Sequence, residues 1–248
     1  MKPRMDHDGI SSPVYKQIAD HLLDQIESGK LRPGDRLLTE RELSKRLSVN
    51  RMTVRRAFQS LESKGFINRL QGSGTYVAEP KIERQVSFLI SFTRGMQRRG
   101  YVPGAKIIRF ERRVVEDPIG EELKLTDSAP VYNIHRLRLL NQEPVLLERL
   151  IIPIFRFPDL ERYDLSIRSL YEVMEKEYSI SVVHARQSLE PVLAFDYEAE
   201  LLEVEPGTPL MLEKRLAFEQ DGQPVEYGRD LYRGDRFLFV TDIAPLEF

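Results

Sequence analysis

The stretch from Thr39 to Val77 decides the fold of the first part of this chain. It reads TERELSKRLSVNRMTVRRAFQSLESKGFINRLQGSGTYV. Thr39 and Glu42 have the spacing of a capping box, which predicts that a short helix begins here. Asn50 is a good N-cap for a second helix, and the glycines of residues 72–74 predict a turn between two short strands. Two capped helices followed by a hairpin indicate a helix-turn-helix with a wing.

The second of these helices combines an apolar stripe with basic residues. Apolar side chains between Val54 and Leu61 follow the spacing i, i+3, i+4, i+7 and should face a core. Arg51, Thr53 and Arg55 fall outside the stripe, at positions that a recognition helix inserts into the major groove. A three-helix core with ordinary surface arginines is the alternative. The agreement of the caps, the basic helix and the glycine wing favours DNA binding.

Composition and charge agree with a chain of two unlike parts. The 248 residues have no cysteine and no apolar run long enough to span a membrane, and Met1–Gly9 has no secretory signal, so we expect a cytoplasmic protein. Residues 1–77 carry 14 Lys and Arg against 9 Asp and Glu, a net charge of +5. The remaining residues carry 23 against 30, a net charge of −7. A basic first part predicts an anionic partner for that part alone.

The rest of the chain has the pattern of an α+β domain. We expect residues 10–78 to form the DNA-binding domain, residues 79–87 a linker, and residues 88–248 a second domain. Hairpins over 131–153 and 210–232 are interleaved with short helices, which indicates a mainly antiparallel sheet flanked by helices. Residues 237–243 are expected to complete that sheet.

Arg136 and Arg138 mark the candidate site of the second domain. They are two residues apart on a predicted strand, so they share a face with Tyr132, Ile134 and other apolar residues. An arginine on a buried face needs an anion. An internal salt bridge, with Glu148 of the returning strand, and a ligand site are both open, because the parity of the hairpin loop decides which side chains Glu148 faces.

Three hydroxyl residues add a hint of anion binding. Ser91, Thr93 and Ser169 all lie at predicted helix starts, where backbone N–H groups favour anions. Capping is the simpler explanation, and Ser169 with Glu172 has the spacing of a second capping box.

The first domain resembles the DNA-binding domain of the GntR family of bacterial regulators. The resemblance covers residues 12–78 and rests on Pro13-Val14-Tyr15, Leu31-Arg32-Pro33-Gly34-Asp35, Thr39-Glu40-Arg41-Glu42-Leu43, Asn50 to Ala57, and Gly72 to Val77. It implies that Arg41 and Arg51 read guanines, that Thr53 and Arg55 hold phosphates, and that Gly72 lets the wing enter the minor groove. Ser73 stands where a basic residue is common, so we expect the wing to contribute less affinity than the recognition helix.

The second domain is similar to the effector-binding UTRA domain of the HutC subgroup, which has a fold like that of chorismate lyase. The resemblance covers residues 88–244 and rests on Ser91-Phe92-Thr93, Gly100 to Gly104, Arg136-Leu137-Arg138, Glu148, Glu190-Pro191 and Tyr232 to Arg236. The pattern is most similar to that of repressors of amino-sugar use that sense glucosamine-6-phosphate or N-acetylglucosamine-6-phosphate. It implies a phosphate site of Ser91, Phe92, Thr93, Arg136, Arg138 and Ser169, with Glu148, Tyr171, Glu226 and Tyr232 facing the sugar.

Together these features predict a homodimeric regulator, a repressor that leaves palindromic operator DNA when a small anionic effector binds. Other members of the subgroup sense urocanate or trehalose-6-phosphate, so a non-sugar carboxylate is an alternative effector. A chorismate-lyase-like enzyme is the alternative of a different class, although such an enzyme would need neither the basic helix nor the wing. No cofactor, metal or catalytic residue is expected, because the four histidines show no metal-ligand spacing and no catalytic triad or carboxylate pair can be argued.

Overall fold

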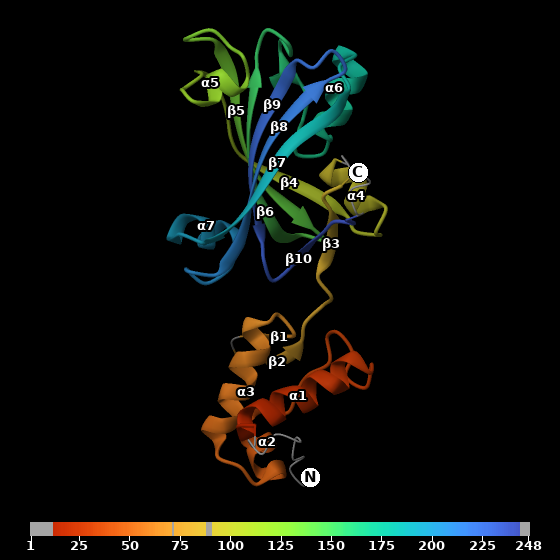
Figure 1. The fold of residues 1–248 in the computed structure, drawn as a ribbon, viewed down its shortest axis with the longest axis vertical. Helices are drawn as coiled ribbons and strands as arrows, with labels where there is room; N and C mark the ends of the chain where they lie inside the picture. Colours follow the sequence, from red (N-terminus) through yellow and green to blue (C-terminus); the bar gives the residue numbers. More distant parts are fainter. Residues whose placement is uncertain (1–11, 71, 88–90, 244–248) are drawn as a thin grey trace, which may run out of the picture. The chain divides into compact units, whose positions relative to one another are not determined.

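The computed structural model describes residues 12–70, 72–87 and 91–243. The chain divides into two compact units between Lys81 and Ile82 (Figure 1). The expectations for Met1–Gly9 and for Gln71 of the wing turn lie outside the described residues.

The first unit is a three-helix core with a two-stranded wing. Its elements are α1 (Val14–Glu27), α2 (Glu40–Leu47), α3 (Arg51–Ser63), β1 (Ile67–Leu70) and β2 (Gly74–Val77). The predicted capping box at Thr39 and Glu42 is confirmed, and Asn50 caps α3 by accepting a 2.8 Å hydrogen bond from the Met52 N–H. The predicted stripe of α3 is buried, because its apolar residues from Val54 to Leu61 are at most 1% exposed. Local capping and one apolar stripe thus position the helix-turn-helix.

The second unit is built around a six-stranded antiparallel sheet with strand order β4-β5-β6-β9-β8-β7. This confirms the predicted α+β class. Its elements are β3 (Ile82–Gln85), α4 (Phe92–Gln97), β4 (Pro103–Val114), α5 (Ile119–Glu122), β5 (Pro130–Leu140), β6 (Glu143–Pro153), η1 (Leu160–Arg162), α6 (Leu170–Tyr178), β7 (Val182–Leu193), α7 (Asp196–Leu202), β8 (Pro209–Glu219), β9 (Pro224–Arg233) and β10 (Phe237–Val240).

Helices cover both faces of this sheet. On one face α4 and α6 pack over the row that contains Tyr132, Ile134 and Leu140. On the other face α5 and α7 pack over the residues that alternate with that row, such as Val131 and Leu137. Figure 1 shows the two pairs of helices on opposite sides of the sheet. The strands therefore bury both faces, and side chains one residue apart lie in different cores.

The structure differs from the sequence-based expectation at the linker and at the last strand. Residues 82–85 of the expected linker form β3, and β10 pairs with β3 in parallel instead of completing the large sheet. Ile82 and Phe237 are 3% and 4% exposed, and both pack into the core under α4. Burial of these apolar side chains explains why the segment is ordered as a strand although its charged residues suggested a linker.

The turn and register of the β5–β6 hairpin determine which side chains Glu148 faces. Its turn has two residues, Asn141 and Gln142, both with positive φ, as a tight hairpin turn requires. A bulge then shifts the register beyond Arg138. As a result Glu148 lies directly opposite Arg136 and points to the same face.

Candidate functional site

A cavity of about 430 Å³ lies on the α4 and α6 face of the sheet. We call it the effector cavity, after the residues that the sequence suggested for effector binding. It is large enough for a small polar metabolite. All ten residues that the sequence suggested for effector binding line it: Ser91, Phe92, Thr93, Arg136, Arg138, Glu148, Ser169, Tyr171, Glu226 and Tyr232.

Arg136 forms the internal salt bridge that was one of the two interpretations. Its Nε donates to Glu148 Oε2 at 2.7 Å, and its Nη2 lies 2.5 Å from the same oxygen. Its Nη1 donates to the Leu165 carbonyl at 3.0 Å. The Arg136 side chain is 1% exposed, so its charge is compensated within the protein. Arg136 therefore serves mainly to fix Glu148 at the wall of the cavity.

Arg138 is less completely paired. Its Nη2 donates to Thr93 Oγ1 at 2.9 Å, whereas its Nη1 is 3.7 Å from Glu148 Oε2. The guanidinium lies 4.6 Å from the centre of the Phe92 ring, a cation–π distance. Burial lowers the pKa of Arg138 to about 10, so it is still charged at neutral pH. Arg138 is the cation of this cavity best placed to meet an anionic group.

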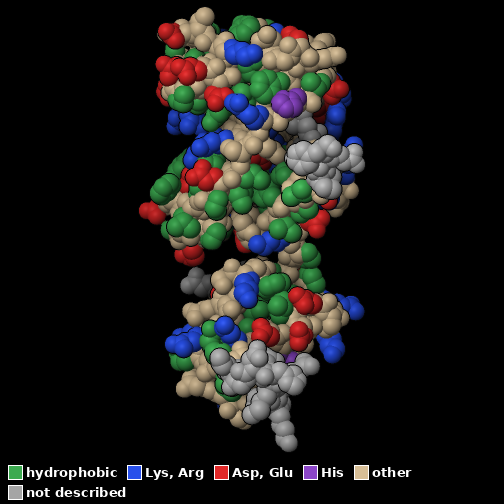
Figure 2. Space-filling model, viewed as in Figure 1, with side chains coloured by type: hydrophobic (Ala, Val, Ile, Leu, Met, Phe, Trp, Pro, Cys, Tyr) green, Lys and Arg blue, Asp and Glu red, His purple; other side chains and the backbone are tan. Residues whose placement is uncertain are grey.

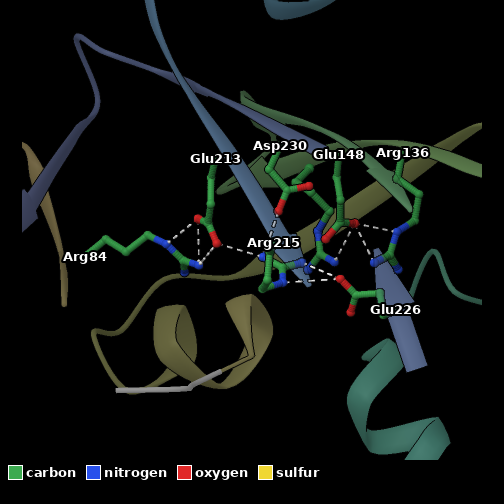
Figure 3. Close-up of polar contacts among 8 residues, drawn as sticks. Arg84, Arg136, Glu148, Glu213, Arg215, Glu226 and Asp230 are labelled. Carbon is green, nitrogen blue, oxygen red and sulfur yellow. Dashed lines mark hydrogen bonds and ion pairs between the residues drawn. The ribbon is translucent and has the colours of Figure 1, made fainter. Parts of the chain in front are cut away.

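A second set of charged residues continues this network. The sequence analysis selected Glu226 of this set but not Arg84, Glu213, Arg215 or Asp230. Arg215 donates to Glu213 at 2.9 Å, to Asp230 at 3.0 Å and to Glu226 at 2.8 Å. Arg84 of β3 donates to Glu213 at 3.2 Å. Figure 3 shows these side chains running from Arg84 through Arg215 toward Glu226 and Glu148. The signal that could have found them is the Glu213/Arg215 spacing, which repeats the i, i+2 pattern of Arg136/Arg138.

Unpaired polar atoms gather at this cavity. Among the described residues, seven buried side-chain nitrogen or oxygen atoms have no hydrogen-bond partner, and five of them belong to residues that line the cavity. Buried polar groups are rarely left unpaired in a folded protein, so the concentration of such atoms here points to a polar ligand. The five atoms are Gln85 Oε1, Arg138 Nε, Tyr171 Oη, Glu226 Oε2 and Asp230 Oδ1.

One carboxyl group of this charged network, that of Asp230, is shifted toward its neutral form. Four arginines and four carboxylates lie in this network, so their formal charges balance. They are Arg84, Arg136, Arg138 and Arg215 with Glu148, Glu213, Glu226 and Asp230. Burial raises the pKa of Asp230 well above its ordinary value, Arg215 opposes this, and the neighbouring carboxylates add to the rise. A protonated Asp230 would leave the lining with an excess of positive charge and give it a hydroxyl donor.

The hydroxyl residues divide into two kinds. The Ser91 Oγ accepts a hydrogen bond from the Arg94 N–H at 3.3 Å and so caps α4. The expected capping box at Ser169 is wrong, because the Ser169 side chain makes no cap hydrogen bond. Ser169 is 4% exposed and lines the cavity. Its hydroxyl therefore remains for another partner.

The second candidate surface lies on the first unit. Arg41 and Arg51 are exposed, Thr53 and Arg55 are half-buried, and Gly72 and Ser73 are exposed at the tip of the wing. Gly72 has a φ of +76°, which favours glycine. The Ser73 and Tyr76 hydroxyls are hydrogen-bonded at 2.7 Å, which fixes the wing tip.

Glu40 is the charged residue of this surface that the sequence analysis did not select. Its carboxylate lies 3.2 Å from Arg51 Nε, 3.1 Å from Arg55 Nη2 and 3.5 Å from Arg69 Nη2. Burial raises the pKa of Glu40, but hydrogen bonds from Arg55 and Arg51 outweigh it and the pKa lies below its ordinary value. Glu40 thus holds three arginines of α3 and β1 around one charge.

In the part of the chain that the structure describes, no helix is long and apolar enough to cross a membrane.

Comparison with known proteins covers both units. Residues 14–77 match the family described as bacterial regulatory proteins, gntR family, and residues 98–238 match the UTRA domain. The HTH-type transcriptional repressor NagR of Bacillus subtilis is 36% identical over 92% of this chain and 93% of its own length. The mannosyl-D-glycerate transport/metabolism system repressor MngR of Escherichia coli K12 is 30% identical over 92% of this chain and 95% of its own. The crystal structure of PhnF from Mycobacterium smegmatis has a TM-score of 0.65 and 28% identity, covering 93% of this chain and 99% of that one.

Proposed function

Because this chain belongs to the GntR family of bacterial regulatory proteins and carries a UTRA domain, it is a DNA-binding transcriptional regulator, and we propose that a phosphorylated sugar bound in the effector cavity releases it from its operator. Its relatives NagR and MngR are named as repressors, which supports repression as the sign of its action. The same relatives support a regulator and not the chorismate-lyase-like enzyme. The predicted resemblances to the GntR family and the UTRA domain are confirmed.

One observation carries the proposal for the effector. Arg138 faces the effector cavity with an unpaired Nε, and four further unpaired polar atoms line the same cavity. A phosphate on Arg138, with the hydroxyls of Thr93 and Ser169 beside it, would supply the missing anion. Tyr171 Oη, Glu226 Oε2 and Asp230 Oδ1 would then meet the hydroxyl or amino groups of the sugar. The lining supports a ligand with one anionic end and one end rich in hydrogen-bonding groups.

On the DNA side, the proposal assigns Arg41 and Arg51 to guanines, Thr53 and Arg55 to phosphates, and the wing of Gly72 and Ser73 to the minor groove. Arginine suits the first role because its planar fork matches guanine O6 and N7. A palindromic operator has two half-sites, so we propose a homodimer. A protein that binds operator DNA acts where the chromosome is, which supports the cytoplasm as its location.

The first test is an operator titration with and without glucosamine-6-phosphate. Effector and operator should weaken each other's binding by the same factor, because coupling between two sites is reciprocal. We expect the operator affinity to fall roughly 5- to 150-fold at saturating effector, the usual range of such couplings. Fluorescence anisotropy of a labelled operator measures it. An operator affinity that stays constant across a panel of sugar phosphates would contradict sensing of this class.

A non-sugar carboxylate such as urocanate is the second candidate effector, and the cationic Arg138 would suit it as well. The same panel separates the two classes when it includes urocanate beside glucosamine-6-phosphate, N-acetylglucosamine-6-phosphate and trehalose-6-phosphate. If urocanate alone releases the protein from the operator, the effector is a carboxylate.

A smaller effect is expected from Glu40→Gln. The change removes the charge that holds Arg51 and Arg55, so Arg55 becomes free for phosphates and the DNA-reading surface gains one positive charge. Binding to non-operator DNA should strengthen, and the slope of log affinity against log salt should steepen by about one unit. The ratio of operator to non-operator affinity should fall, because Arg51 loses its anchor.

Glu62→Gln is the matched control, since Glu62 pairs only with Arg69 among the described residues. Both variants change the net charge equally. If they shift operator and non-operator binding by the same amounts, Glu40 has no special part in positioning the arginines.

A further inference from the structure

A row of basic side chains crosses the sheet on the face opposite the effector cavity. Arg109, His135, Arg149, Arg229 and Lys214 lie directly opposite one another on the neighbouring strands β4, β5, β6, β9 and β8. Side chains alternate between the two faces along a strand, so the chain neighbours of these residues point to the effector cavity side. For example, Arg136 follows His135, and Glu148 precedes Arg149. We call this set the basic row.

Four residues of the basic row, all except Lys214, line a hollow between two helices. Toward α7 the next residues along the strands are apolar, such as Leu147 and Leu231, and toward α5 they include Ile151 and Tyr227. A cavity of about 470 Å³ is lined here by Arg109, Arg113, His135, Arg149, Glu198 and Arg229, among others. Figure 2 shows Lys and Arg side chains gathered between the positions that Figure 1 gives α5 and α7.

The charges of the hollow are only partly compensated. Arg113 pairs with Glu116 at 2.8 Å, and Arg109 lies 3.7 Å from Glu111. No carboxylate of the described residues lies within 4 Å of Arg149 or Arg229. Within the described residues, Arg149 Nε donates only to the neutral Asn133 Oδ1, at 3.1 Å. The cavity-lining carboxylate, Glu198, accepts the Phe195 N–H at 3.0 Å as part of the cap of α7.

This arrangement costs stability as it stands. Like charges directly opposite on neighbouring strands repel each other, and Arg149 faces both His135 and Arg229. Burial lowers the pKa of Arg149, Arg113 and Arg229 lower it further, and the more weakly acting Glu116 and Glu111 oppose them without reversing the shift. Burial likewise lowers the pKa of His135, with Arg149, Arg109 and Arg229 adding to the effect, so the imidazole is kept neutral and can donate one hydrogen bond. Half-buried arginines without a counter-charge, at the bottom of a hollow, are what an anion site requires.

We propose that the hollow between α5 and α7 is a second binding site, for a compact oxyanion with two or more phosphate or carboxylate groups, held by Arg149 and Arg229. The arginine forks of neighbouring strands would contact separate anionic groups of one ligand, and Arg109 and Arg113 would close the sides. The inference does not depend on the proposed sugar phosphate, because the effector cavity lies on the other face of the sheet and shares no lining residue with this hollow.

The test is calorimetric titration of the full chain with pyrophosphate, and separately with citrate, at constant ionic strength. We expect saturable binding of at least one of them, and the two arms distinguish a phosphate from a carboxylate ligand. In Arg149→Gln and in Arg229→Gln the affinity should fall about tenfold, since each removes a charge-assisted contact. Without ligand, both variants should unfold at the wild-type temperature or above it, because a repulsion is relieved.

Two matched variants complete the test. Arg186→Gln removes the same charge from an exposed position of β7 outside the hollow, and Arg138→Gln removes a cation of the effector cavity. Arg186→Gln should bind the anions as the wild type does, and in Arg138→Gln the binding event that Arg149→Gln weakens should remain. Binding that is lost in Arg138→Gln but kept in Arg149→Gln, or an equal loss in Arg186→Gln, would overturn the proposal. So would a lower unfolding temperature, or a change of oligomeric state, in Arg149→Gln and Arg229→Gln, since either would make the row a structural or subunit contact.

Discussion

Replacing Arg138 by glutamine is expected to leave operator binding intact and to raise the effector concentration needed for release about 30-fold or more. Arg138 is 5% exposed, and an anion bound to it would lose the partner of a buried, charge-assisted hydrogen bond. Truncating such a pair costs about 2–5 kcal/mol, and 2 kcal/mol corresponds to about 30-fold. The measurement is the glucosamine-6-phosphate concentration that half-dissociates a labelled operator complex.

Arg138 is a better probe than Arg136, although both were sequence-based candidates. Removing Arg136 would leave the Glu148 carboxylate buried without its main partner, which is strongly destabilising. Arg138 can be removed while the Arg136–Glu148 pair remains. Arg162→Gln is the control, because Arg162 is 75% exposed and carries the same charge outside the cavity. If the Arg138→Gln variant leaves the operator at the same effector concentration as the wild type, the effector anion binds elsewhere.

The local signals of the sequence identified most of the elements of the first unit. Capping residues such as Thr39 and Asn50 act within one turn of chain, so their effect can be read without knowing the tertiary structure. The burial of Arg136 and Arg138 could also be anticipated, because the period of two along a strand assigns a face. Both the helix caps and the strand face could be predicted because each depends on residues close together in the sequence.

Pairing between distant segments could not be inferred in the same way. Arg215 joins Glu213, Glu226 and Asp230 of two strands, and its position depends on the register of β8 against β9, which includes a bulge. Gly228 makes room for it, since a Cβ there would lie 2.9 Å from Arg215 Nη2. A glycine inside a strand is a sign of such close approach, but it does not say which side chain approaches.

The same limit explains the strand that was expected to be a linker. β3 and β10 are separated by more than a hundred residues, and they pair in parallel from Ile82 opposite Phe237. Neither segment alternates clearly between apolar and polar residues. Their pairing brings Arg84 to Glu213 of the buried network. Because residues 82–85 were expected to be a linker, Arg84 was not predicted to belong to the site.

Replacing Arg51 by alanine is expected to abolish the preference for the operator while the fold is kept. Arg51 is the first residue of α3 and its side chain is 60% exposed, so its loss should change the free energy of unfolding by no more than about 0.5 kcal/mol. Glu40 holds it at Nε, which leaves the two terminal nitrogens for guanine O6 and N7. A bidentate contact of this kind is worth about 1–3 kcal/mol.

On the two half-sites of the proposed homodimer the loss is doubled to about 2–6 kcal/mol, or roughly 30-fold to 10⁴-fold in operator affinity. Titrations with operator and with scrambled DNA at one salt concentration measure it, and circular dichroism checks the fold. Lys64→Ala removes the same charge at the exposed C-terminal end of α3 and should weaken both DNAs alike. Arg51→Lys keeps the charge but not the fork, so it should behave as the alanine variant does on the operator. An operator preference that survives in Arg51→Ala would mean that the bases are read by other side chains of this surface.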